Sequence, residues 1–355
     1  MKGTMKTDFF KKFIDDLGDP DTSIAADGTA SSEFSGYIDT GSYVLNAALS
    51  GSIFGGFPNN KAVVFAGDPA TGKTFFALGL VKQWQEQNKN GRVFYFDTES
   101  AVTNQMMETR GIDTKRVAKS EPSSLEGFRN TAVKLLDKYA EIPKDERWPL
   151  LLVLDSLSML PSRKEMVDVA EEKDTKDMTK PGIIKGTFRL IRLKLAKVQV
   201  PFIVTNHVYA QIGSYMPTKT MAGGSGAQYA SDTIVMLSKK QEKVGDDVVG
   251  ILVHVHIKKS RLSRENTKVD VRILFDGGLD RYYGLLDYAV EAGLIKKVST
   301  RFELPDGSKL FEKAILANPE KVFTQELMEK LDEYMKPKFT YTATTSETTK
   351  EGTNE

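Results

Sequence analysis

The chain has 355 residues, of which 40% are hydrophobic and 27% charged, a composition typical of a globular protein of about two domains. The absence of cysteine excludes disulfides, thiolate metal sites and a cysteine nucleophile. Lys and Arg number 49 against 48 Asp and Glu, so any binding of nucleic acid must come from a local basic patch. No apolar run reaches the ~18 residues of a membrane helix, and the N-terminus lacks a signal-peptide core. We therefore expect a cytoplasmic protein without membrane contact.

Residues 1–36 predict an N-terminal arm. Residues 8–17 (DFFKKFIDDL) predict a short amphipathic helix with a broad apolar face, and residues 18–36, rich in Gly, Ser, Asp, Ala and Thr, predict a flexible linker. The arm is expected to dock on a neighbouring copy of the chain, because a head-to-tail contact of this kind generates open filaments or rings. The alternative is a helix packed on its own core.

Residues 37–282 predict an α/β core. Apolar runs typical of buried strands occur at 62–66, 93–96, 150–154 and 202–205, and helical patterns separate them. This alternation favours a mainly parallel, twisted sheet with helices on both faces. Beyond residue 230 the strand-like runs have few helices between them, and the period of two in 251–258 predicts an antiparallel extension of the sheet.

The C-terminal part of the chain divides into two regions. Residues 283–338 show helical patterns again and predict a small helical C-terminal domain. Residues 339–355 are rich in Thr and Glu with almost nothing apolar, which predicts a disordered tail.

A phosphate-binding loop is predicted at 67–74, where GDPATGKT matches G-x-x-x-x-G-K-[ST] between a strand and a helix. The glycines allow a tight turn that aims backbone N–H groups at one point, and the helix N-terminus adds its dipole. Lys73 would contact the β- and γ-phosphates of ATP, and the Thr74 hydroxyl would bind Mg²⁺. The residues expected to hold the nucleotide are Gly67, Asp68, Pro69, Ala70, Thr71, Gly72, Lys73, Thr74 and Phe75.

Three polar residues follow predicted strands, and the carboxyl ends of parallel strands meet at one edge of a sheet. Asp155 ends LLLVLD and is expected to orient the shell of a Mg²⁺ ion, while Glu99, after VFYFD, can activate the attacking water. A helix cap and a solvated loop acid are the respective alternatives. His207, in PFIVTNHV, can donate a hydrogen bond to the γ-phosphate and report it to the next segment, or be an ordinary loop histidine.

Two further features bear on ligands. His254 and His256 share one face of a predicted strand, and we interpret them as strand residues because no third metal ligand is visible. The helix at 183–198 carries five cations and no acid, which is typical of a phosphate-tracking surface or of a solvated face.

The order of the motifs resembles a known family. GDPATGKT, FDTES, LLLVLDSL, VTNHV, GGSGAQYASDTIVM, IKKSR and FDGGLDRYYGLLDYAVEAGLI are similar to the RecA recombinases, in particular the UvsX-type recombinases of T4-like bacteriophages. The resemblance covers roughly residues 37–295. It implies a RecA-type ATPase core that forms a helical filament on single-stranded DNA and exchanges strands with a homologous duplex. Implied partners are neighbouring copies of the chain, a phage mediator and a single-strand-binding protein, in the host cytoplasm.

The resemblance also implies roles for individual segments. Two DNA-binding loops would lie near 160–180 and 209–228, and Tyr209 and Tyr215 in the second offer surfaces on which bases stack. Lys259 and Arg261 would reach the ATP of the neighbouring protomer, where a cation stabilises developing charge.

One position departs from the family. Met106 stands where relatives stack a tyrosine on adenine, so nucleotide selectivity is expected to be looser unless Tyr282 or other groups compensate.

Two other functions share the nucleotide motifs. One is a ring-forming motor such as a replicative DNA helicase, and the other is a regulatory ATPase with negligible turnover. Electron microscopy separates rings from open filaments, and a turnover assay with and without single-stranded DNA separates an enzyme from a regulatory switch.

Overall fold

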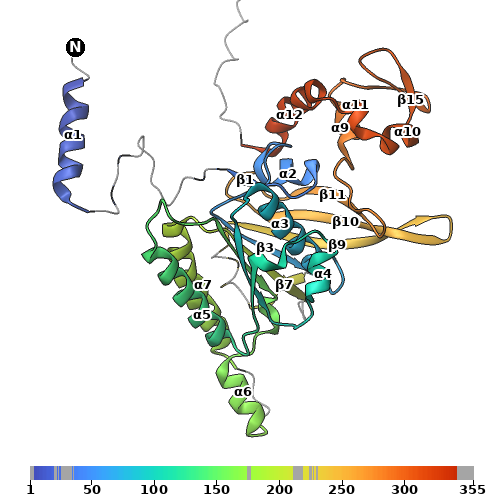
Figure 1. The fold of residues 1–355 in the computed structure, drawn as a ribbon. Coiled ribbons are helices and arrows are strands. Elements are labelled where there is room, and N and C mark those ends of the chain that lie inside the picture. The colour runs from blue at the N-terminus through green and yellow to red at the C-terminus, as the bar shows by residue number, and fades with distance from the viewer. Residues whose placement is uncertain are drawn as a thin grey trace, which may run out of the picture.

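A single ten-stranded sheet organises the chain (Figure 1). The computed structural model describes residues 4–19, 22, 24, 34, 36–173, 177–210, 219–223, 226, 228 and 231–341. The strand order is β12-β11-β10-β9-β3-β7-β6-β4-β5, with β8 paired to β7. The non-sequential order β3-β7-β6-β4-β5 reflects crossover connections through helices.

The parallel half of the sheet comprises β3 (Ala62–Gly67), β4 (Arg92–Asp97), β5 (Val117–Ser120), β6 (Leu150–Asp155) and β7 (Phe202–Ala210). Every residue of β3 and β6 is buried, as expected of strands covered on both faces. The predicted parallel core is therefore confirmed. Its edge strand β5 was not predicted, because this strand has only four residues, of which two are polar and two are exposed.

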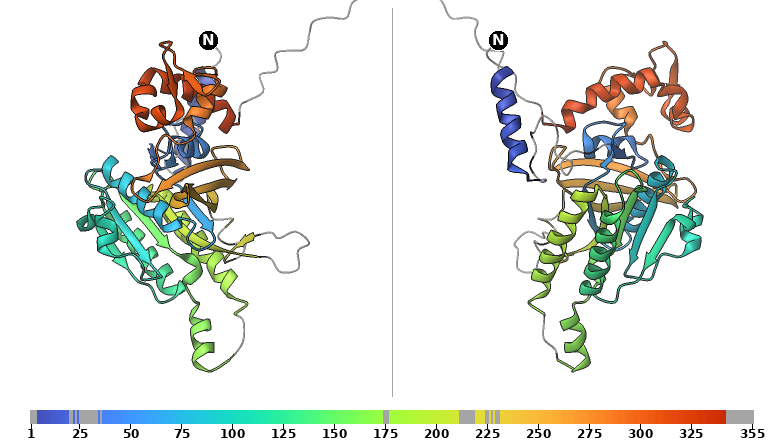
Figure 2. Two further views of the ribbon diagram at one scale, coloured as in Figure 1. Left: turned by 90° about the vertical axis from the view of Figure 1, so that its right-hand side faces the viewer. Right: turned by 60° about the vertical axis from the view of Figure 1, so that its left-hand side comes forward.

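Helices cover both faces of this half (Figures 1 and 2). On one face lies α3 (Lys73–Gln87), while α2 (Tyr43–Ser50) covers the antiparallel half of the sheet; on the other face lie α5 (Leu125–Glu141) and α7 (Lys180–Val198). Alternate residues of β3 divide between the two resulting cores: Val63 and Phe65 pack on the α3 side, and Val64 and Ala66 on the α5 side. A two-stranded ribbon, β1 (Tyr37–Ile38) with β2 (Phe57–Pro58), borders α2.

The sheet continues through four more strands, β9 (Thr233–Val244), β10 (Asp247–Lys259), β11 (Thr267–Leu274) and β12 (Gly278–Leu279). β9 runs parallel to β3, and the pairs beyond it are antiparallel. Val253 and Val255 are buried, whereas His254 lies on the other face with its Nδ1 2.7 Å from Asp270 Oδ1. The predicted antiparallel extension is confirmed, and His254 and His256 are strand residues of β10.

The C-terminal region contains more than helices. Its helices are α9 (Leu285–Glu291), α10 (Glu312–Ala317), α11 (Pro319–Val322) and α12 (Gln325–Phe339). Between them, β13 (Lys296–Val298), β14 (Arg301–Glu303) and β15 (Lys309–Phe311) form a three-stranded antiparallel sheet. The purely helical prediction missed these strands because a strand of three residues is too short to show a period of two.

The proposed boundary near residue 283 stays a prediction. Buried residues of the C-terminal region, such as Leu285 and Leu331, belong to the same apolar cluster as Ile38 and Leu45 of the core. Asp332 Oδ1 also accepts hydrogen bonds from Ser52 Oγ at 2.8 Å and from the Ile53 amide at 2.7 Å. The C-terminal region therefore rests firmly on the α2 side of the core.

The N-terminal helix α1 (Thr4–Leu17) stands away from the sheet (Figures 1 and 2). Phe9 is 75% exposed, and Phe10, Phe13 and Leu17 are each more than half exposed. The helix thus does not bury this face on the described part of its own chain. Most of the predicted linker and tail, residues 25–33 and 342–355, lie outside the described residues. None of the described helices is both long and apolar enough to span a membrane.

Candidate functional site

The loop between β3 and α3 has the shape of an anion-binding cradle. A Cβ added to Gly67 would lie 2.6 Å from both Leu237 O and Thr71 Oγ1, so only glycine fits there. Residues 68–71 form the turn, and Ala70 and Gly72 have φ values of 60° and 94°, in the left-handed region. Gly72 begins α3 without a side-chain hydrogen bond, which leaves the first N–H groups of the helix to an anion.

Lys73 is folded back into this loop. Its Nζ donates to Gly67 O at 3.0 Å and to Asp68 O at 2.9 Å, and the residue is only 7% exposed. Burial lowers the pKa of the Lys73 ammonium, and the carboxylates of Glu99 and Asp155 oppose that shift. A cation held by two carbonyls in an anion cradle fits a phosphate ligand. Thr74 and Phe75 follow in the first turn of α3.

Asp155 ends β6 and is buried between two hydroxyl groups. Its Oδ2 accepts from the Tyr95 phenol at 2.8 Å, and its Oδ1 accepts from Thr205 Oγ1. Burial and the adjacent Asp155 charge raise the pKa of Tyr95 well above its usual value, so the phenol stays a donor. Each carboxylate oxygen keeps lone pairs for water of a Mg²⁺ shell. Asp155 is not a helix cap, since Ser156 occupies that position before the short helix η3 (Leu157–Met159).

Glu99 and His207 meet beside the phosphate loop. Ser156 Oγ donates to Glu99 Oε1 at 2.8 Å, and His207 Nε2 lies 3.4 Å from the same oxygen. His207 also pairs with Gly67 in the register of β7 against β3. The structure thus brings together Lys73, Glu99, Asp155 and His207, four residues singled out from the sequence, at the carboxyl ends of β3, β4, β6 and β7.

Sequence reasoning missed the residues that orient these groups. Tyr95 and Thr205 fix Asp155, and Ser156 fixes Glu99. Thr98 joins the two loops, because its Oγ1 donates to Ser156 O at 2.7 Å and accepts from the Ser156 amide at 2.8 Å. The available signal was the hydroxyl residues next to the acids in DTES and LDSL.

Comparison with known proteins gives the family. A family model described as the RecA N-terminal domain matches residues 17–280. The chain belongs to the RecA family. It is 34% identical over 254 residues to the recombination and repair protein of enterobacteria phage T4, across 72% of this chain and 63% of that protein. It is 27% identical over 291 residues to a RecA protein of Thermus thermophilus, across 80% of this chain and 81% of that protein.

The resemblance read from the motifs is therefore confirmed at the level of the family. The chain spans about 63% of the length of its phage T4 relative. Among solved structures, a chain from a crystal structure of the RadB recombinase is similar to 69% of this chain and 99% of its own length, with a TM-score of 0.49 and 21% identity.

A cavity of about 780 Å³ in this RecA-family protein lies along α3, beginning at Phe75, the residue after the phosphate-loop motif. Phe75, Arg110 and the 65% exposed Phe275 are among its lining residues, and the Arg110 guanidinium stands 5.8 Å from the centre of the Phe75 ring. Met106, on α4 (Asn104–Glu108), is not among the lining residues, but its carbonyl accepts from Arg110 Nη1 at 2.9 Å. The role of Met106 stays a prediction, and Phe275 is an aromatic surface that sequence reasoning missed.

Tyr282, the alternative stacking residue, is not among the residues that line this cavity. Its ring packs against Tyr43 at 5.2 Å and against Phe323 at 5.8 Å between ring centres. It therefore belongs to the junction between the core and the C-terminal region.

The second predicted DNA loop begins beside the site, and its returning strand pairs with β7 there. β8 (Lys219–Met221) pairs with β7, and Asn206 Nδ2 donates to Ala222 O at 2.9 Å while the Ala222 amide donates to His207 O at 2.9 Å. Tyr209 is 59% exposed. The intervening residues 211–218, which include Tyr215, lie outside the described residues, as do 224–225, 227 and 229–230. The Asn206 side chain and the His207 carbonyl thus hold the returning end of the hairpin at Ala222.

The first predicted DNA loop contains a helix, α6 (Arg163–Ala170). Ser162 and Glu165 form a capping box at its start. Asp177 Oδ2 accepts from Ser162 Oγ at 2.5 Å, and the hydrogen bonds from Ser162 and Thr179 lower the pKa of Asp177 to about 2. Residues 174–176 lie outside the described residues. This segment is therefore a structured projection, seen at the foot of Figure 1.

Several of the cations on α7 form ion pairs. Arg192 Nη2 lies 2.6 Å from Asp232 Oδ1, and Lys194 forms an ion pair with Asp137. Lys185 and Arg189 are exposed near the start of the helix, and a phosphate-tracking surface there stays a prediction.

Lys259 and Arg261 lie far from the phosphate loop of their own chain. Lys259 pairs with Ile234, which pairs with Val64 near the start of β3, whereas the phosphate loop follows the end of β3. Lys259 Nζ donates to Gln228 O and Ser231 O, both at 2.8 Å. Arg261 is an exposed residue with its Nε 3.5 Å from Asp232 Oδ1. The structure does not bring these two cations to the nucleotide site within one protomer.

Proposed function

We propose that this RecA-family protein is an ATP- and Mg²⁺-dependent recombinase that assembles on single-stranded DNA and exchanges strands with a homologous duplex. The observation that carries the proposal is the meeting of Lys73, Glu99 and His207 beside the β7–β8 hairpin. The printed names of its relatives, a recombination and repair protein and RecA, support the same function. A mediator and a single-strand-binding protein are proposed partners, in the cytoplasm of a phage-infected host.

Each polar group has a defined task in hydrolysis. The N-terminal N–H groups of α3 and the Lys73 ammonium bind the phosphates. Glu99, oriented by Ser156, accepts a proton from the attacking water. Mg²⁺, held by the Thr74 hydroxyl and through water by Asp155, would neutralise charge on the phosphates. Tyr95 and Thr205 keep the Asp155 carboxylate aimed at that position.

His207 links the nucleotide to the DNA-binding hairpin. Its Nε2 is near Glu99 at 3.4 Å and can donate instead to a γ-phosphate oxygen. The backbone of His207 and the side chain of Asn206 both hold Ala222, so a shift of the histidine moves the end of the hairpin. Nucleotide binding can therefore order the segment that contacts DNA.

Replacing His207 with alanine is expected to weaken the dependence of DNA binding on ATP. The ratio of the affinities for single-stranded DNA with and without ATP should fall by roughly 5- to 150-fold, the usual range of a coupling between two sites. Fluorescence anisotropy of a labelled oligonucleotide measures both affinities. His254→Ala, which removes an exposed histidine of β10, should leave the ratio unchanged. An unchanged ratio in His207→Ala would remove His207 from the coupling.

The position of Lys259 and Arg261 supports a role in a neighbouring protomer. Both lie at the end of the sheet opposite the phosphate loop, so a head-to-tail neighbour can present them to the γ-phosphate that its partner exposes. A cation delivered in this way stabilises the charge that develops during phosphoryl transfer. ATP then joins neighbouring protomers, and its hydrolysis loosens the contact.

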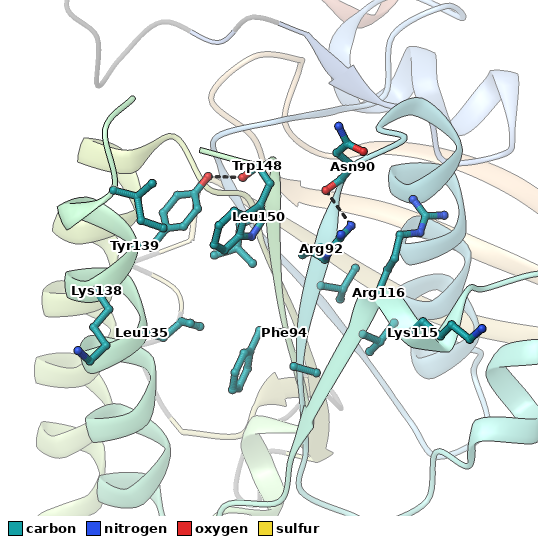
Figure 3. Close-up of a pocket in the computed structure, with 14 residues that line it drawn as sticks. Asn90, Arg92, Phe94, Lys115, Arg116, Leu135, Lys138, Tyr139, Trp148 and Leu150 are labelled. Atoms are coloured by element: carbon teal, nitrogen blue, oxygen red, sulfur yellow. Dashed lines mark hydrogen bonds between the residues drawn. The ribbon is translucent and has the colours of Figure 1, made fainter. Parts of the chain in front are cut away.

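A second contact between protomers is proposed at the free edge of the sheet. A cavity of about 720 Å³ lies between α5 on one side and β4 and β5 on the other (Figure 3). Phe94, Tyr139 and Trp148 make it apolar, and its charged lining residues within the described chain are the cations Arg92, Lys115, Arg116 and Lys138. We call it the edge groove.

The edge groove suits the N-terminal arm of another copy. The apolar face of α1 is exposed, and the last turn of this helix carries Asp15 and Asp16, opposite in charge to the groove. Among the described strands β5 pairs with β4 alone, so its other edge also offers backbone groups to an incoming segment. A contact in which the arm of each protomer binds the next protomer can repeat without closing into a ring, which generates a filament.

Deleting residues 1–17 is expected to abolish long filaments, because the apolar face of α1 can no longer be buried on a neighbour. Electron microscopy with ATP and single-stranded DNA measures filament length. The double substitution Lys11→Ser and Lys12→Ser, which leaves the apolar face of α1 intact, is the control and should preserve filaments. Filaments of ordinary length from the truncated protein would contradict the docking of this arm.

Strand exchange tests the proposed function as a whole. The protein is incubated with a circular single strand, a homologous linear duplex and ATP, or a slowly hydrolysed ATP analogue. Joint molecules should form with ATP and homologous DNA, whereas a heterologous duplex should give none. If homologous and heterologous duplexes behave alike, the protein is not a recombinase.

A further inference from the structure

Hydrogen bonds join the loop that carries Arg261 to the end of the C-terminal region. This loop, residues 260–266, connects β10 and β11 and contacts the end of α12 through Arg264. The Arg264 amide donates to Phe339 O at 2.7 Å, and Arg264 Nε donates to Thr340 O at 2.7 Å. The Glu265 amide adds a bond of 3.3 Å to the Tyr341 hydroxyl. These contacts join parts of the chain that are about 76 residues apart. We call them the α12 clamp.

The end of α12 that accepts these bonds is a fixed anchor. A Cβ added to Gly51 would lie 2.1 Å from Thr340 Cγ2, so the core backbone approaches Thr340 as closely as glycine allows. Asp332 bonds the same segment of the core through Ser52 and Ile53. Phe339 is the last residue of the helix and Thr340 is its C-terminal cap, and the helix dipole favours a cation such as Arg264 at this end.

The loop itself transmits the position of Arg264 to Arg261. Ser260 and Ser263 are buried, and Ser260 Oγ accepts from the amides of Leu262 at 3.2 Å and Ser263 at 3.0 Å. Residues 260–263 are therefore held in a tight turn that contains Arg261 and ends next to Arg264. The exposed side chain of Arg261 can project from this turn in a direction that the clamp determines.

We infer that the C-terminal region positions the cation that each protomer presents to its neighbour, with Arg264 as the positioning residue. The partner is a second copy of this chain, and the inference rests on the proposed role of Arg261. The end of α12, remote from the phosphate loop of its own protomer, would then control ATP turnover in the adjacent one.

The first test compares three substitutions. Arg264→Leu should lower DNA-stimulated ATP turnover by about 10- to 100-fold, since small misplacements of a catalytic group have effects of that order. ATP binding in the absence of DNA should be unchanged. Arg264→Lys, which can still donate to Thr340 O, should recover part of the loss. Arg301→Leu, an exposed arginine stacked on Phe311 in the same region, is the control and should behave as the unmodified protein.

Mixed filaments decide whether the effect acts across the interface. Arg264→Leu is mixed with Lys73→Met, which lacks a working nucleotide site but keeps an intact clamp and Arg261. Turnover of the mixture should exceed the sum of the two variants alone, because Lys73→Met protomers present Arg261 to intact sites of Arg264→Leu protomers. A parallel mixture of Arg261→Ala with Lys73→Met tests the role of Arg261 by itself.

The two mixtures separate the possible failures. Rescue of Arg261→Ala in its mixture would support the role of Arg261 between protomers. If, in the same experiment, Arg264→Leu shows no defect, or shows a defect that mixing does not rescue, the inference about the α12 clamp is wrong while the role of Arg261 stands. If Arg261→Ala is not rescued either, the proposed role of Arg261 between protomers fails, and the inference fails with it.

Discussion

Replacing Glu99 with glutamine is expected to lower ATP turnover by about 10²- to 10⁴-fold while leaving nucleotide binding intact, because a positioned general base contributes about this much. The amide oxygen of glutamine can still accept the hydrogen bond that Ser156 Oγ donates at 2.8 Å. It cannot take a proton from water. The variant should therefore hold ATP for longer and keep its ATP-dependent affinity for single-stranded DNA.

Phosphate release in the presence of single-stranded DNA measures the rate, and anisotropy of a fluorescent ATP analogue measures binding. Glu141→Gln, at the exposed end of α5, is the matched control and should be unaffected. Turnover of Glu99→Gln at the rate of the control would assign water activation to another group.

The second large effect is expected for Lys73→Met, which should lower ATP turnover by at least about 10²- to 10³-fold, the usual effect of removing one transition-state donor. Methionine fills nearly the same volume without the ammonium that binds Gly67 O, Asp68 O and, in the bound state, the phosphates. This variant should also lose ATP binding, and with it the ATP dependence of DNA binding. It differs in this respect from Glu99→Gln, which should keep both.

Equilibrium binding of the fluorescent ATP analogue checks this directly. Lys134→Met, on the exposed surface of α5, controls for the loss of one positive charge. Thermal unfolding of both variants establishes that the fold is retained. A folded Lys73→Met that bound ATP as tightly as the control would show that the phosphates are held elsewhere.

Much of the fold could be predicted from the sequence because the central strands are buried on both faces. The runs that became β3 and β6 are continuously apolar, and the motif between β3 and α3 fixes a strand, a turn and a helix in order. The three strands β13, β14 and β15 gave no such signal, since each has only three residues. Strands of this length are stabilised by their neighbours and not by an apolar face of their own.

The candidate site likewise contains residues that could be predicted from the sequence and residues that could not. Glu99, Asp155 and His207 could be predicted to converge because parallel strands end at one edge of the sheet. Tyr95 and Thr205 could not, because they act on Asp155 from the adjacent strands, 60 and 50 residues away in the sequence. Arg264 is a similar case, since its partner carbonyls belong to a helix whose docking only the folded chain reveals.

The central claim is that ATP bound at Lys73 joins neighbouring protomers and thereby controls DNA binding. The most direct measurement is the affinity for single-stranded DNA with and without ATP, combined with electron microscopy of the same samples. We expect tight binding and open helical filaments with ATP, and weak binding without it. Closed rings would favour a ring-forming motor instead. Equal affinity in the two conditions, with no polymer in either, would contradict the account.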